Sequence, residues 1–84
     1  MKLSAKVYVT LKRGVLDPQG QAVSRSLRGL GFDEVGDARI GKFIELELDA
    51  PDEAAARQRL GEMCERLLSN TVIEDYRIEV GARA

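Results

Sequence analysis

Few residues in this chain of 84 could carry out catalysis. Cys64 is the only cysteine and there is no histidine, which excludes a cysteine–histidine pair, a cysteine metal cluster and the commonest general base. Cys64 falls on the apolar stripe of a predicted helix, where a buried, unreactive thiol is expected. Glu45, Glu47 and Glu79 lie on polar rows of predicted strands, and paired carboxylates can do acid–base chemistry. The pattern supplies neither a cavity nor a partner for them, and such rows are usually just solvated.

The segment KRGVLDPQG, from Lys12 to Gly20, is the first candidate for a contact surface. Gly14 permits a turn, and Asp17 followed by Pro18 is typical of a helix start. Gly20 then lies in the first helical turn, where glycine costs up to ~1 kcal/mol relative to alanine. Glycine in such a place usually admits another backbone or a ligand. A simple turn and helix cap explain the segment equally well, and the functional interpretation is a surface for a partner chain or an anion, formed by Lys12, Gly14, Asp17, Gln19 and Gly20.

The stretch from Val35 to Asp49 has the period-2 alternation of a strand with one buried face. A hairpin turning at Gly41 and Lys42 would place charged residues in the apolar row, so we predict one continuous strand kinked at Gly41. A strand of about 15 residues is too long for this small domain to cover, since the average is about 5–6. We expect a second copy to pair with it, with the crossover near Arg39, Gly41 and Lys42. A kink with a solvated basic pair is the simpler explanation.

Tyr8 and Phe43 fall on polar rows of the predicted strands. Exposed aromatic residues on a sheet are typical of RNA-recognition folds, but the same face would carry Glu45, Glu47 and Glu79, which repel a phosphate backbone. We therefore expect Phe43 to serve sheet-to-sheet packing between subunits. The net charge of −1 and the isoelectric point near 5.4 also argue against nucleic acid or an acidic membrane as the main partner. Neither a signal peptide nor an apolar run of transmembrane length is visible, so the expected location is cytoplasmic.

The predicted elements alternate strand, helix, long strand, helix and strand. The first strand has about 10 residues, the first helix runs from about Pro18 to Leu30, and the second ends near Ser69 and Asn70. This order predicts an α+β, ferredoxin-like-related β-α-β(long, kinked)-α-β antiparallel sheet with two helices on one face, completed by dimerisation. With no catalytic, cofactor-binding or metal-binding set, the chain is interpreted as a binding or assembly subunit. It is expected to be a single domain, residues 1–84, with 81–84 as a frayed tail.

Several blocks of the sequence resemble the PurS family. They are KVYVTLK at 6–12, GVLDPQG at 14–20, LRGLGF at 27–32, ARIGKFIEL at 38–46 and LLSNTVIEDY at 67–76. The similarity extends from Lys2 to Val80, and the combination of the GVLDPQG and ARIGK blocks is specific.

The resemblance implies a small, non-catalytic subunit of phosphoribosylformylglycinamidine (FGAM) synthase, the enzyme of the fourth step of de novo purine biosynthesis. The complex converts formylglycinamide ribonucleotide, ATP and glutamine into FGAM, ADP, phosphate and glutamate. The implied partners are a PurL-type synthetase subunit, a PurQ-type glutaminase subunit and further copies of this chain, as a dimer or tetramer. The implied task is to bridge the two enzymes and support ammonia transfer. ATP, Mg and glutamine would be used by the complex, and no cofactor by this chain.

Two other functions remain open on the residues alone. One is a free-standing ligand-sensing domain of ferredoxin-like type that dimerises around a small molecule. The other is a single-strand RNA binder, which the charge disfavours. A sensor should bind a metabolite when isolated, whereas a bridging subunit should co-purify with a synthetase and a glutaminase.

Overall fold

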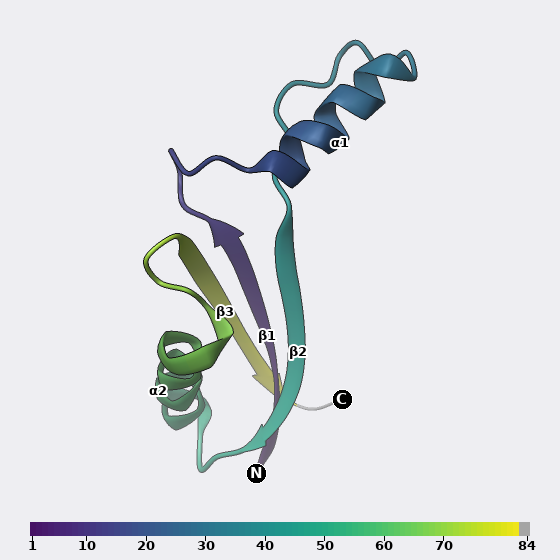
Figure 1. Cartoon of the computed structure of the whole chain (residues 1–84). Coiled ribbons are helices and arrows are strands. Elements are labelled where there is room, and N and C mark those ends of the chain that lie inside the picture. The colour runs from purple at the N-terminus through teal and green to yellow at the C-terminus, as the bar shows by residue number, and fades with distance from the viewer. Residues whose placement is uncertain (83–84) are drawn as a thin grey trace.

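The computed structural model describes residues 1–82, in which strands and helices alternate (Figure 1). The elements are β1 (Lys2–Leu11), α1 (Pro18–Gly29), β2 (Gly41–Asp49), α2 (Glu53–Met63), the π-helical turn η1 (Cys64–Leu68) and β3 (Glu74–Ala82). The predicted β-α-β-α-β order is confirmed.

β1 is the central strand of an antiparallel sheet with the order β2-β1-β3. The residues that β1 turns to one face are buried: Leu3, Ala5, Val7 and Val9. In the register of the sheet, Val7 lies between Ile44 of β2 and Ile78 of β3. The predicted alternation therefore holds for all three strands, because one apolar face runs across them.

α2 covers this apolar face on its β3 side (Figure 1). Leu60 and Cys64 are fully buried and belong to the same apolar cluster as Val7 and Val9. Burial, with the neighbouring Glu65 carboxylate, raises the pKa of the Cys64 thiol. The predicted burial of Cys64 is confirmed, and a thiol that stays protonated is a poor nucleophile.

The second helix ends in a π-helical turn instead of continuing as a regular α-helix. The N–H of Ser69 donates to the carbonyl of Cys64 at 3.0 Å, five residues earlier. Leu68 packs against the core, whereas Leu67 is 83% exposed. Both leucines continue the apolar spacing that includes Leu60 and Cys64, and the wider turn rotates Leu67 away from the buried side of the helix.

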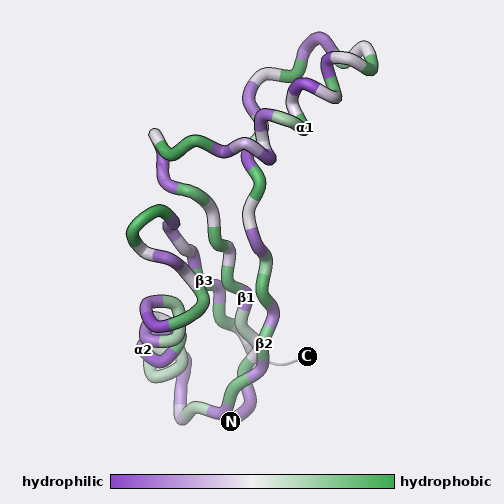
Figure 2. The backbone as a smooth tube through the Cα atoms, viewed as in Figure 1, coloured by the Kyte–Doolittle hydropathy of each residue, from purple (hydrophilic) through white to green (hydrophobic). Residues whose placement is uncertain are grey.

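α1 lies beyond the end of the sheet and not on its face (Figure 1). The molecule is elongated, with extents of 50 × 30 × 14 Å, and Figure 2 shows the segment that carries α1 well separated from the strands. We call residues 12–40 the arm. Among the described residues only α2 covers the sheet, so the expected layer of two helices on one face does not form within one chain. The reason is that a hydrogen bond from the N–H of Ile40 to Asp17 ties the start of α1 to the residue before β2, so the helix is held beyond the end of the sheet.

β2 begins at Gly41, so the prediction of a continuous strand from Val35 is wrong for the single chain. Side chains take the place of strand partners before Gly41. Arg28 donates to the Val35 carbonyl at 3.2 Å, and the N–H of Ile40 donates to Asp17 at 2.8 Å. These bonds hold the backbone in an irregular path that sequence alternation alone does not reveal.

The ends of two other elements also test the sequence predictions. α1 stops at Gly29, one residue short of the predicted Leu30, and Gly31 follows with a φ of 102°, as a helix-ending glycine does. β3 continues to Ala82, with Gly81 paired to Ser4. The predicted frayed tail is therefore wrong for residues 81 and 82, and residues 83–84 lie outside the described residues.

Candidate subunit interface on the arm

The two ends of the arm meet at the carboxylate of Asp17. Its Oδ1 accepts a hydrogen bond from the N–H of Gly20 at 2.8 Å, and its Oδ2 accepts one from the N–H of Ile40 at 2.8 Å. The first bond caps α1, as predicted, and the second ties the helix start to the residue before β2. These two hydrogen bonds hold the pKa of the buried Asp17 carboxyl below its ordinary value, and the bond from Gly20 has the larger effect.

Gly20 lets the returning part of the arm pass close to α1. A Cβ atom at this position would overlap the backbone carbonyl of Ala38. The prediction that Gly20 admits another backbone is confirmed, and that backbone belongs to the same chain. Gly20 is buried in this contact, so it serves the packing of the arm itself.

Arg39 fastens the base of the arm to the end of β1. Its Nη2 donates to the carbonyl of Leu11 at 2.7 Å and to that of Lys12 at 3.0 Å. Gly41 follows, where a Cβ atom would overlap the carbonyl of Val9. Arg39 and Gly41 thus fix the junction between arm and sheet, at the place where the sequence predicted a crossover.

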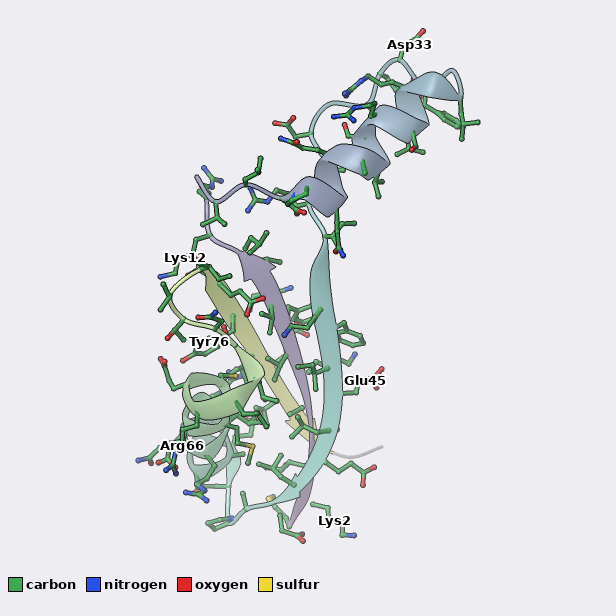
Figure 3. All side chains as sticks on the ribbon, in the orientation of Figure 1. Lys2, Lys12, Asp33, Glu45, Arg66 and Tyr76 are labelled. Atoms are coloured by element: carbon green, nitrogen blue, oxygen red, sulfur yellow. The ribbon has the colours of Figure 1, made fainter. Side chains whose placement is uncertain are left out.

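Other predicted contact residues remain on the surface around this base. Gln19 and Lys42 are exposed and line one groove of ≈ 460 Å³ together with Asp17 and Gly41. Lys12 is half-buried at the end of β1 (Figure 3), and Gly14, with a φ of 87°, turns the chain just beyond it. Four of the predicted residues therefore line one groove, whereas Lys12 and Gly14 lie outside it.

Phe43 lies apart from the arm residues, on the sheet face that α2 leaves open. Its ring centroid is 5.1 Å from that of Tyr8, its cross-strand partner, and the Arg77 guanidinium lies 4.2 Å from the Tyr8 centroid. Aromatic and cation–π contacts of this kind stabilise the positions of the side chains, and we call Tyr8, Phe43 and Arg77 the aromatic platform. Phe43 is 51% exposed, so the platform offers contact area to a neighbouring molecule.

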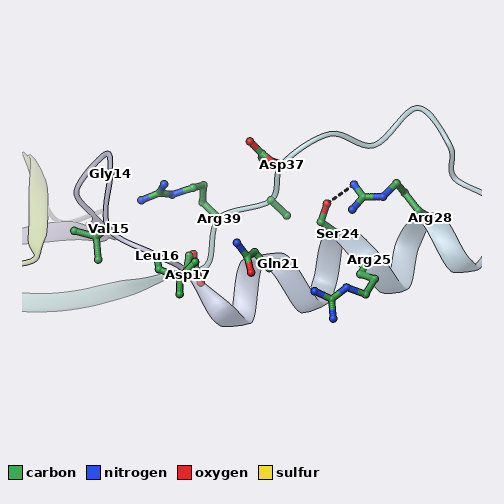
Figure 4. Close-up of a pocket in the computed structure, with 11 residues that line it drawn as sticks. Gly14, Val15, Leu16, Asp17, Gln21, Ser24, Arg25, Arg28, Asp37 and Arg39 are labelled. Carbon is green, nitrogen blue, oxygen red and sulfur yellow. Dashed lines mark hydrogen bonds between the residues drawn. The ribbon is translucent and has the colours of Figure 1, made fainter.

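Sequence reasoning missed Ser24, Arg25 and Arg28 on α1. They line a groove of ≈ 500 Å³ between the helix, the turn at 14–16 and the returning segment at 37–39 (Figure 4). Arg28 Nη1 donates to Ser24 Oγ at 2.8 Å, and Ser24 Oγ donates to the carbonyl of Gly36. The serine and Arg28 are four residues apart on one helix side, a spacing visible in the sequence. Nothing in the sequence showed that another segment folds over them.

The chemistry of these grooves is that of a contact surface. Within residues 1–82 no three or more histidine, cysteine or acidic side chains are placed to hold a metal ion. The helices of this part of the chain are too short or too polar to cross a membrane. Arginine side chains, backbone donors and exposed apolar residues suit the binding of another protein.

One known protein family matches nearly the whole chain. Its model, PurS, described as phosphoribosylformylglycinamidine (FGAM) synthase, matches residues 4–82. This chain belongs to the PurS family. The PurS subunit of FGAM synthase from Synechocystis sp. is 57% identical to it over 77 residues, which is 92% of this chain and 77% of the relative. The Bacillus subtilis PurS subunit is 55% identical over 75 residues, 89% of this chain and 88% of the relative.

Solved PurS structures share the fold. B. subtilis PurS in its C2 crystal form is 51% identical and matches with a TM-score of 0.83, over 94% of this chain and 98% of that one. The structure of PurLQS from Thermotoga maritima contains a chain that is 31% identical, with a TM-score of 0.89 over 96% of this chain and 99% of that one. As a PurS protein, this chain is a subunit of FGAM synthase in purine biosynthesis. The membership in FGAM synthase that the resemblance implies is confirmed, and it displaces the sensor and RNA-binding alternatives.

Proposed function

We propose that this PurS protein bridges a PurL-type synthetase subunit and a PurQ-type glutaminase subunit and has no active site of its own. The observation that carries the proposal is the likeness to a chain in the structure of PurLQS from T. maritima. The elongated shape supports it, because the arm and the open sheet face present separate surfaces (Figure 1). In this proposal ATP, Mg and glutamine are used by the partner subunits, and the complex is cytoplasmic.

Bridging has a physical purpose in ammonia transfer. Ammonia that escapes into water is diluted and protonated to ammonium, which is not a nucleophile. A subunit that holds two active sites in register raises the local concentration of ammonia and excludes water from its route. Four of the predicted contact residues that the structure leaves at least partly exposed are our candidates for this docking: Lys12, Gln19, Lys42 and Phe43.

Reconstitution of the complex with and without this chain tests the bridge. Without the chain, glutamine-dependent FGAM formation is expected to fall at least about tenfold, because ammonia is no longer handed over at high local concentration. Ammonia-dependent FGAM formation should change by less than about twofold, since free ammonium salt replaces the glutaminase. Equal loss of both activities would show that the chain supports the synthetase site itself, and no loss of either would refute the bridge.

A second copy of the chain is proposed to cover the apolar side of α1. Val23, Leu30 and Phe32 are 40%, 75% and 48% exposed, and exposed apolar residues that lie close together on the surface mark contacts with other proteins. Beside α2 lies a groove of ≈ 330 Å³. Its apolar lining consists of Leu46, Met63, Leu67 and Leu68. α1 of a second copy seated there would supply the helix that the sheet lacks within one chain, and would complete the predicted two-helix layer.

Charges on the apolar side of α1 should separate the copies. A Val23→Glu/Leu30→Glu double variant is expected to raise the dissociation constant of the dimer at least about tenfold, because two carboxylates would lose their water in the contact. Sedimentation equilibrium gives the mass independently of the elongated shape. Gln21→Glu, on the opposite side of the same helix, is the matched control and should keep the wild-type mass. A double variant with the wild-type mass would contradict this contact.

A further inference from the structure

The side of α1 that faces away from its apolar stripe carries an arginine groove, formed by Ser24, Arg25 and Arg28 with Arg39 from the returning segment (Figure 4). The three α1 residues and Gln21 are spaced i, i+3, i+4, i+7, so they share one helix side. Val23, Leu27 and Leu30 project about half a turn away. A second copy packed on the apolar stripe therefore leaves the arginine groove open.

Within residues 1–82, neither Arg25 nor Arg28 is paired with a carboxylate. Arg28 donates to Ser24 Oγ and backbone carbonyls, and Arg39 donates only to backbone carbonyls, which are neutral acceptors. Arg25 makes no hydrogen bond or ion pair within residues 1–82. Of the two acids that line the groove, Asp17 accepts from two N–H groups and interacts electrostatically with Arg39, and Asp37 points outward in Figure 4.

The charge of the whole molecule is divided between the arm and the rest. Residues 12–40 contain five Lys and Arg against four Asp and Glu, whereas the remaining residues contain eight against ten. The open sheet face contributes to the negative part, with Glu45 and Glu79 flanking Lys6 in the register. A long polyanion such as nucleic acid would meet repulsion there. A local acidic surface that contacts only the arm would not.

We propose that the arginine groove docks an acidic surface of another subunit of the complex, with carboxylates received by Arg25 and Arg28. The inference rests on the proposed bridging function and names the chemistry of one of its contacts. Guanidinium groups bind carboxylates in a fork geometry that a lysine cannot reproduce. The bonds from Arg28 and Arg39 to backbone oxygens hold two of the three guanidinium groups in place before binding, which lowers the entropy lost on docking.

The test measures the affinity of the full-length chain for the purified synthetase and glutaminase subunits at about 50 mM and about 300 mM sodium chloride. Arg25→Glu is expected to weaken binding to one of the two subunits at least about tenfold at low salt and to flatten its salt dependence. Arg57→Glu on α2 makes the same charge change outside the arm and should bind within about twofold of wild type. Arg25→Lys should give an intermediate affinity, because it keeps the charge and loses the fork.

Each other outcome overturns the inference in a distinct way. If wild type binds a subunit and Arg25→Glu binds equally well, the groove is not the contact, although the bridge stands. If wild type binds neither subunit, the proposed function fails as well. If Arg25→Glu lowers the mass in sedimentation equilibrium, the groove is a contact between copies.

Discussion

A Gly20→Ala variant is expected to melt on the order of 10 °C below wild type. The added Cβ would overlap the backbone carbonyl of Ala38 and approach Asp17 Oδ2 at 2.9 Å. A backbone carbonyl cannot rotate away as a side chain does, so the returning segment has to move and the bond from Ile40 to Asp17 is strained. Overpacking of this kind costs about 1–3 kcal/mol, and each kcal/mol lowers the melting temperature of a domain this size by about 4–8 °C. Circular dichroism during heating measures the change.

Gly61→Ala is the matched control for this variant. Gly61 lies inside α2, and a Cβ atom there would meet nothing within 4 Å. Alanine stabilises an unobstructed helix position by up to ~1 kcal/mol relative to glycine, so the melting temperature should rise by a few degrees. Opposite signs for the same substitution in two helices would assign the effect to the contact with Ala38. A Gly20→Ala protein that melts with or above wild type would show that the arm base yields without loss.

Local chemistry made the helix start and the strands of this chain predictable. Asp17 and Pro18 signal a cap and a first turn wherever they occur, because the cap bond joins residues only three positions apart. Gly20 was recognisable as a place of close approach, since glycine is unfavourable in a helix without such a reason. The alternation in β1 and β3 reflects one buried face, which the sequence records residue by residue.

The path of the arm depends on contacts that are distant in sequence, and there the pattern misled. Ala38 and Ile40 continue the apolar alternation of β2, yet the N–H of Ile40 is bonded to Asp17, 23 residues earlier. Alternation reports which side chains are apolar and not which backbone partner is present. Arg25 and Arg28 look like ordinary surface residues for the same reason. They become part of a groove only because the segment at 37–39 returns beside them.

An Asp17→Asn variant is expected to lose the anchoring of the arm at neutral pH and to converge with wild type in acid. Asparagine keeps one acceptor oxygen, but an NH₂ donor replaces the other oxygen. That NH₂ group would face a backbone N–H, so two donors would meet and one of the two hydrogen bonds would be lost. The folded-state pKa of Asp17 is depressed by the N–H groups of Gly20 and Ile40. Its contribution is therefore fully present above the unfolded pKa, about 4, and is lost as the pH falls through the lower folded value. We expect melting several degrees below wild type at pH 7, and a gap that narrows below about pH 4.

Melting temperatures of both proteins between about pH 7 and about pH 2.5 check this sign. Asp52→Asn is the comparison at pH 7, because Asp52 caps α2 through one bond, from the N–H of Ala55 at 2.8 Å, and joins no distant segment. Asp52→Asn should lower the melting temperature at pH 7 by less than Asp17→Asn does. Trypsin cleavage at Arg25 and Arg28 should accelerate only in Asp17→Asn, where the base of the arm has opened. A gap between wild type and Asp17→Asn that stays constant down to the lowest pH would mean that the ionised carboxylate does not hold the arm. In that case the steric fit at Gly20 and the bonds from Arg39 would have to fix the arm without it.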